Sequence, residues 1–307
     1  MSPVLQYTFE QEIYSTLAGL SLLAYDTLCT LTQEVDLVWH GTWGLGNYLY
    51  IYARYAPFAS TGVALRTMLG VNTAAQCKMY FQVYTTIACL TFNVCEVVLL
   101  FRTYALYGGG RGIVIACLVI YGLTMGPATV IDMYQLTTLQ LYDGGTPRQG
   151  CVGTVSPILG ISYILLGICE ITIVVLTGIK AVQHLRSLSR RDQRENWVMQ
   201  LYGQGFAFSA LALTVSVVQI SSIFLMPAHS NWLSFAQQLL HGVICSRLLL
   251  LIFQQKRVAT YLPSTQAALS APVLTTQALS AFEDSEMDFA AQEYELTTYR
   301  TPSLQRA

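Results

Sequence analysis

The chain has 307 residues, of which 53% are hydrophobic and only 11% are charged, whereas about a quarter of the residues in a typical soluble domain are charged. Together with a mean hydropathy of +0.47, this composition indicates a membrane protein. The net charge of −1 points to neither a nucleic acid nor another polyanion as a partner.

Seven apolar segments are long enough to cross a bilayer as helices, since a span needs roughly 20 residues. They are residues 13–32, 45–65, 79–101, 113–134, 157–179, 203–226 and 233–253. The first two are the weakest, because one contains Asp26 and the other contains Arg54 and Pro57, so hydropathy alone favours five strong spans and two weak ones. The stretches between the segments have the composition of loops. The sequence therefore predicts an all-α, polytopic bundle of seven transmembrane helices over residues 13–253.

The orientation of this bundle follows from its lysines and arginines, which concentrate near helix ends on the cytoplasmic side. With the N-terminus outside, nine lie on the inner side: Arg102, Arg111, Lys180, Arg186, Arg190, Arg191, Arg194, Lys256 and Arg257. Three lie on the outer side: Arg66, Lys78 and Arg148. The distribution predicts an extracellular N-terminus, formed by the short stretch 1–12, and a cytoplasmic C-terminus.

The last part of the chain, residues 254–307, is rich in Ser, Thr, Ala and Gln. Such a segment buries too little apolar surface to offset the entropy of ordering it. It is predicted to be a disordered cytoplasmic tail.

Two cysteines fall on the predicted outer side, which is oxidising. Cys77 precedes the third segment, and Cys151 lies in the loop between the fourth and fifth segments. They either form a disulfide that ties this loop to the third helix or remain two free thiols.

Arg102 ends the third segment and follows Cys77 by 25 residues, which is about one membrane crossing at 1.5 Å per residue. This pattern distantly resembles seven-helix receptors of the G-protein-coupled type, with a bridged cysteine at the outer end of helix three and an arginine at its inner end. The chain departs from that class at Phe101, where an acid is expected, in a sixth segment without proline, and in a last segment without Asn-Pro-x-x-Tyr. The alternative is that Arg102 is only a positive anchor at the inner interface.

Six ionisable side chains fall at membrane depth: Asp26, Arg54, Glu96, Glu170, Arg247 and His241. Charges at such depth are costly, face the interior of a bundle and pair with one another. We therefore expect one interior polar network, in which Arg54 or Arg247 offsets Asp26, while Glu34 and Asp36 lie beyond it at the inner interface. The network is either a static clasp or a switch whose pairing differs between two states.

A basic stretch follows the fifth segment over residues 180–194. The positive-inside rule alone explains it, and a surface for anionic lipid or an acidic partner is the functional alternative. With Arg102, a candidate signalling surface consists of Arg186, Arg190, Arg191 and Arg194.

Several motifs are concentrated in the first two segments and their loop. They are Tyr25-Asp26, Glu34, Trp39, Trp43, Leu45-Gly46 and Arg54-Tyr55-x-Pro57-Phe58, with RTYALYG and SRLLLL later in the chain. These motifs resemble a fungal, chiefly basidiomycete, family of multi-spanning membrane proteins filed as a domain of unknown function. The resemblance implies a seven-helix architecture and no known activity. The chain departs from it at His40-Gly41-Thr42 and Asn47, where basic residues are expected.

The function best matched to these features is that of a receptor-like seven-helix sensor in the plasma membrane. Its partners would be the lipid bilayer, an unidentified ligand, and a heterotrimeric G protein or another cytoplasmic signalling protein. A transporter or proton-coupled carrier, with Asp26, Glu96 and Glu170 as relay carboxylates, and a scaffold are the alternatives. No enzyme, metal site or cofactor is predicted, because His241 is the only histidine in a segment and no lysine for a retinal Schiff base lies in the last one.

Overall fold

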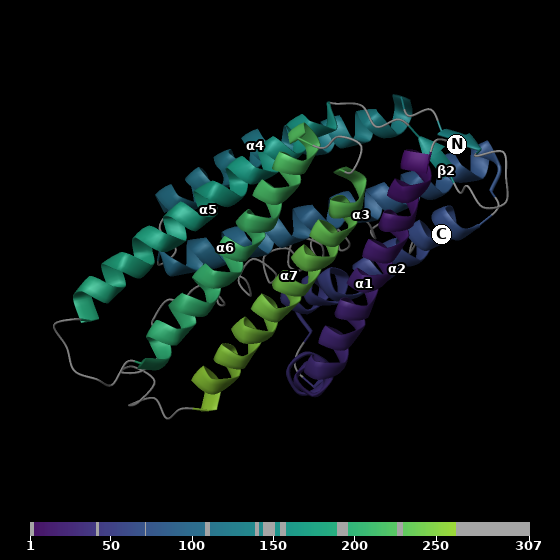
Figure 1. Cartoon of the computed structure of the whole chain (residues 1–307). Helices are drawn as coiled ribbons and strands as arrows, with labels where there is room; N and C mark the ends of the chain where they lie inside the picture. Colours follow the sequence, from purple (N-terminus) through teal and green to yellow (C-terminus); the bar gives the residue numbers. More distant parts are fainter. Residues whose placement is uncertain are drawn as a thin grey trace, which may run out of the picture.

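A computed structural model describes residues 3–40, 43–70, 72–107, 111–138, 141–143, 151–153, 158–188, 196–225 and 230–261. Seven α-helices run through this part of the chain and form a bundle (Figure 1). They are α1 (Pro3–Glu34), α2 (Leu45–Leu69), α3 (Ala74–Leu106), α4 (Arg111–Thr138), α5 (Leu159–Leu188), α6 (Asn196–Leu225) and α7 (Ser230–Tyr261). The shortest, α2, has 25 residues and is about 37 Å long at 1.5 Å per residue.

Five of these helices are long and apolar enough to cross a membrane. The qualifying stretches are Ala74–Leu106, Arg111–Thr138, Leu159–Gln183, Gly205–Leu225 and Leu233–Gln255. The two helices outside this set, α1 and α2, are the ones that carry Asp26 and Arg54 in their interiors. The chain is thus an integral membrane protein, and the expected division into five strong and two weak segments is confirmed.

All seven helices extend beyond the segments predicted from hydropathy, and α1, α5 and α7 do so furthest at a single end. The first residue of α1 is Pro3, and α7 continues to Tyr261. Hydropathy marks only the apolar part of a helix, whereas polar residues with good helix propensity, such as the stretch from Gln254 to Arg257, prolong it into water. Residues 262–307, predicted to be a disordered tail, lie outside the described residues.

The connection between α4 and α5 contains two short strands, where the sequence predicted only a loop in an all-α fold. β1 (Leu141–Asp143) pairs antiparallel with β2 (Cys151–Gly153), so that Asp143 lies opposite Cys151. β1 also packs against α3, and β2 lies at the same end of the bundle as the N-terminus (Figure 1).

The predicted disulfide falls at this hairpin. Cys77 of α3 is fully buried and disulfide-bonded. The side chain of Cys151 lies outside the described residues, so its pairing with Cys77 stays a prediction.

Helices α3 and α7 form the centre of the bundle. α7 packs against α1, α2, α3 and α6, while α3 packs against α2, α4, α5 and α7. In the most apolar stretch of each helix, 61% of the residues of α7 and 44% of those of α3 are buried, compared with 22% for α4 and α6. The outer helices therefore present their apolar side chains to lipid, and polar groups on α3 and α7 point into the bundle.

Candidate functional site

The first group of buried charges joins α1, α2 and α7 and is called here the Arg54 cluster: Asp26, Glu34, Arg54 and Arg247. Arg54 Nη1 lies 3.3 Å from Asp26 Oδ2, and Arg54 Nε lies 3.3 Å from Glu34 Oε2. Arg247 Nε donates a hydrogen bond to Asp26 Oδ1. Asp26 therefore has two arginine partners, one from α2 and one from α7.

Helix α1 supplies further acceptors to the same guanidinium. Arg54 Nη2 donates to the backbone oxygen of Thr27 at 3.0 Å and to the hydroxyl of Thr30. Because these bonds come from the turn that carries Asp26, they fix α2 against α1 at one register.

Glu34 belongs to this cluster, although the sequence placed it at the inner interface. It is fully buried and accepts hydrogen bonds from Tyr50 at 3.1 Å, Tyr55 at 2.6 Å and Trp39 at 3.2 Å. Asp26, Thr30 and Glu34 recur every four residues and so lie on one side of a helix. That spacing was the signal available in the sequence.

The Arg54 cluster balances its own charge. It holds two carboxylates and two guanidinium groups, so its net charge is zero when all four groups are ionised. Arg54 and Glu34 are completely buried, whereas the side chain of Arg247 remains 43% exposed. A neutral, well-bonded cluster of this kind makes charged residues tolerable inside α1 and α2.

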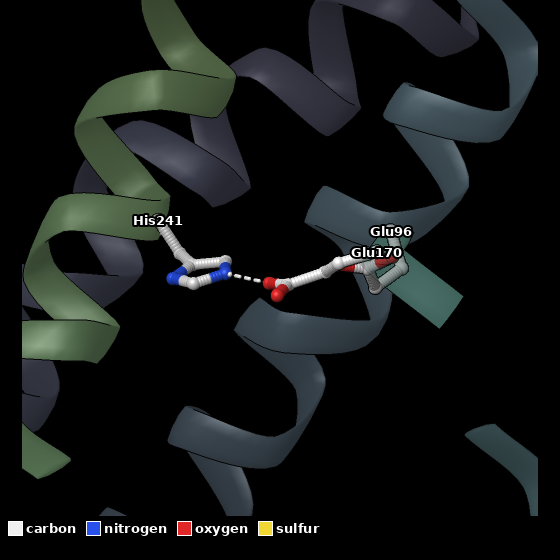
Figure 2. A group of neighbouring side chains, drawn as sticks. All are labelled: Glu96, Glu170 and His241. Carbon is white, nitrogen blue, oxygen red and sulfur yellow. Dashed lines mark hydrogen bonds and ion pairs between the residues drawn. The ribbon is translucent and has the colours of Figure 1, made fainter. Parts of the chain in front are cut away.

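The second group, the His241 cluster, consists of Glu96, Glu170 and His241 from α3, α5 and α7. Figure 2 shows His241 reaching from α7 toward the two carboxyl groups, and its Nε2 lies 2.7 Å from Glu170 Oε1. One nitrogen and two carboxyl oxygens, one from each residue, lie within 4.8 Å of one another. All three side chains are buried to 1% exposure or less.

This cluster has unused hydrogen-bonding capacity. Both carboxyl oxygens of Glu96 and the second oxygen of Glu170 are buried without a hydrogen bond. The thiol of Cys169, which is also buried, interacts with Glu96. Unsatisfied buried oxygens cost free energy and call for a specific explanation, such as an ion or an ordered water.

The six residues predicted to form one network are therefore distributed over two clusters. Asp26, Arg54 and Arg247 belong to one, and Glu96, Glu170 and His241 belong to the other. In the part of the chain that the structure describes, no hydrogen bond or ion pair joins the two.

A cavity of about 200 Å³ lies between the helices beside the N-terminal half of α3, the helix against which β1 packs. It is lined by the N-terminal halves of α3, α5 and α7 and the C-terminal halves of α2 and α4. Five aromatic side chains line its wall: Phe81, Tyr84, Phe92, Tyr163 and Phe235.

Two carboxyl groups also face the cavity. They belong to Glu12 and Asp132, and Asp132 Oδ1 is buried without a hydrogen bond. Sequence patterns do not predict this cavity, because its lining residues come from six helices whose packing the sequence does not show.

The cavity and the His241 cluster share a wall. Phe92 lines the cavity, and its ring lies edge-on to the imidazole of His241 with centroids 5.1 Å apart. A molecule in the cavity would therefore act on His241 through a single aromatic ring.

Arg102, at the far end of α3, packs against α6. Its guanidinium fills the space over Gly205, where an added methyl group would overlap it. Whether Arg102 also acts as a positive anchor at the inner interface stays a prediction. The remaining basic residues of the predicted signalling surface, Arg190, Arg191 and Arg194, and the side chain of Arg186 lie outside the described residues.

One comparison with known proteins identifies a relationship. Residues 14–59 match the model of a family described as a family of unknown function (DUF6533), which agrees with the predicted resemblance to a domain of unknown function. The matched segment carries three of the four members of the Arg54 cluster, and Arg247 is the member outside it. No curated protein matches the chain. The chain is thus similar over 46 of its 307 residues to a family whose function is not known.

Proposed function

We propose that this protein is a receptor-like sensor in the plasma membrane, with seven transmembrane helices, an extracellular N-terminus and a cytoplasmic C-terminus. The observation that carries the proposal is the aromatic cavity beside the N-terminal half of α3, whose wall contacts buried ionisable groups. Pockets of this kind, largely apolar with a few polar groups, are typical of small-molecule sites.

The seven-span topology requires α1 and α2 to lie in the membrane despite their charges. The Arg54 cluster supports this placement, since Asp26 and Arg54 neutralise each other across the two helices. Hydropathy scores each helix alone and therefore counts both charges as costs, whereas the pair enters the bilayer with its charges balanced.

The ligand class follows from the cavity wall. Stacked rings such as Tyr84 and Phe235, whose centroids are 5.0 Å apart, favour a small ligand with an apolar or aromatic body. The buried and unbonded Oδ1 of Asp132 favours an ammonium group or another hydrogen-bond donor on that ligand.

A path for the signal follows from two contacts on α3. Near the middle of the helix, a ligand that moves Phe92 changes the packing around His241. Near its C-terminal end, Arg102 lies against Gly205 of α6, so displacement of α3 relative to α6 alters the cytoplasmic surface offered to a partner. The proposed partner is a heterotrimeric G protein.

Capture of G proteins from nucleotide-depleted native membranes tests this role. The full-length protein is compared with Arg102→Ala and with Arg111→Ala, a matched control at the exposed start of α4. We expect the wild type and the control to retain an α-subunit that GTP releases, and Arg102→Ala to lose it. Equal capture by all three proteins would contradict the role of Arg102.

A proton-coupled carrier is the second candidate, favoured by the unbonded carboxyl oxygens of Glu96. Proton uptake into proteoliposomes distinguishes it from a sensor. A proton-coupled carrier should acidify the lumen of the proteoliposomes when a proton gradient is applied, and Glu96→Gln should abolish this proton uptake. A sensor should transport no protons, either as the wild type or as Glu96→Gln.

A further inference from the structure

The His241 cluster brings together three metal-ligating side chains from three helices. The protonation of its histidine follows from the hydrogen bonds. His241 Nδ1 lies 3.0 Å from the backbone oxygen of Gln237, which is an acceptor only, so Nδ1 carries a hydrogen. Nε2 is the atom that faces Glu170.

This arrangement matches that of histidines in metal sites. A ligating imidazole usually donates its other N–H to a carbonyl or a carboxylate, which fixes the tautomer and the ring orientation. The Gln237 carbonyl has that role here, and the lone pair of a neutral His241 would then lie on Nε2, beside Glu170.

Charge and hydrogen bonding together limit what can occupy the cluster. The cluster places two carboxyl groups and one imidazole in a fully buried site. Both carboxyl oxygens of Glu96 and one of Glu170 have no hydrogen-bond partner among the described residues, so they are open to coordinate an ion. A divalent cation beside a neutral histidine cancels both negative charges and coordinates the open oxygens.

We propose that Glu96, Glu170 and His241 bind a divalent transition-metal ion of the Zn²⁺ class, which links α3, α5 and α7. The imidazole ligand selects such an ion over Mg²⁺ or Ca²⁺, which prefer oxygen ligands alone. The ligand atoms lie within 4.8 Å of one another, and bonds of about 2.0–2.1 Å require them to close around the ion.

The cavity supplies a route for the ion. Phe92 stands between the cavity and His241, so rotation of one ring connects the cluster to the cavity. The thiol of Cys169 interacts with Glu96 and so lies at the edge of the cluster. The metal site can be tested separately from the receptor role, because binding of the ion requires no residue of the cytoplasmic surface and no G protein.

The test uses the full-length protein in detergent, stripped with a chelator and then titrated with ZnCl₂ or MgCl₂. We expect one Zn²⁺ per chain by elemental analysis and a rise in thermal stability with Zn²⁺ that Mg²⁺ does not produce. In Glu96→Gln and His241→Gln, the dissociation constant for Zn²⁺ should rise at least tenfold. Asp132→Asn, which removes a different buried carboxyl group, should bind Zn²⁺ as the wild type does.

Two outcomes would overturn the proposal. One is a wild type without a Zn²⁺-specific shift, and the other is undiminished binding in both cluster variants, which would place the ion elsewhere. Zinc-edge X-ray absorption of the wild-type protein identifies the ligand atoms directly, so the site can be tested even when the variants fail to fold. It should detect nitrogen and oxygen ligands, and a spectrum with sulfur ligands alone would also reject the site.

Discussion

The two buried clusters differ in how completely their polar groups are satisfied. The Arg54 cluster balances two acids with two bases, and its carboxylates each have several donors. The His241 cluster has two acids, one histidine and three carboxyl oxygens without hydrogen bonds. A satisfied buried network rigidifies a fold, while an unsatisfied one at membrane depth marks a functional site. We therefore expect the first cluster to act as a static clasp, and we propose the second as the place where a ligand or ion acts.

Removal of Arg54 should lower the stability of the protein more than any other change considered, and it tests whether the Arg54 cluster holds α1 to α2. Arg54→Ala leaves Glu34 buried with no cation and Asp26 with only the half-exposed Arg247. Uncompensated buried charges of this kind cost about 3–5 kcal/mol. Thermal unfolding of the purified protein measures the loss, and Arg54→Lys should recover part of it by keeping the charge. A loss below about 1 kcal/mol would show that the cluster does not hold α1 to α2.

A second variant probes the close packing beside His241. A Cβ atom on Gly242 would lie 2.7 Å from Pro57 Cγ and 3.1 Å from the backbone oxygen of Ala53, so Gly242→Ala forces α7 away from α2. Overpacking of this kind costs about 1–3 kcal/mol. Gly62→Ala is the matched control on α2, because nothing lies within 4 Å of a Cβ atom there. Thermal unfolding should rank Gly242→Ala well below the control, and equal stability of the two would contradict the close approach.

Arg247 distinguishes a clasp from a switch. Its side chain is 43% exposed, and Asp26 keeps Arg54 when Arg247 is lost, so a static clasp should lose no more than about 1 kcal/mol. Arg247→Ala should thus lower thermal stability slightly and leave basal G-protein capture unchanged. Altered capture at wild-type stability would instead assign the Arg54 cluster to switching.

Sequence reasoning located the charged residues at membrane depth but did not predict how they pair. Hydropathy and helix length give the depth of Asp26, Glu96 or His241 in the bilayer, whereas pairing depends on which face of each helix meets which neighbour. Glu170 and His241 are 71 positions apart in the chain, and they meet only because α5 and α7 both face the centre of the bundle beside α3. Glu34 is the exception, because its four-residue spacing from Thr30 and Asp26 shows in the sequence.

The smallest expected effect on stability comes from the contact between α3 and α6. In Gly205→Ala, the added methyl group displaces the guanidinium of Arg102, which is the far end of a flexible side chain and moves at little cost. Thermal stability should change by less than about 0.5 kcal/mol. Basal capture of a G protein should nevertheless change, because the proposed signalling role depends on where Arg102 lies.

Gly178→Ala controls for a methyl group elsewhere in the bundle, since its Cβ would approach only the ring of Phe206, at 3.3 Å. If Gly205→Ala and Gly178→Ala retain the same capture as the wild type, Arg102 serves only to pack α3 against α6.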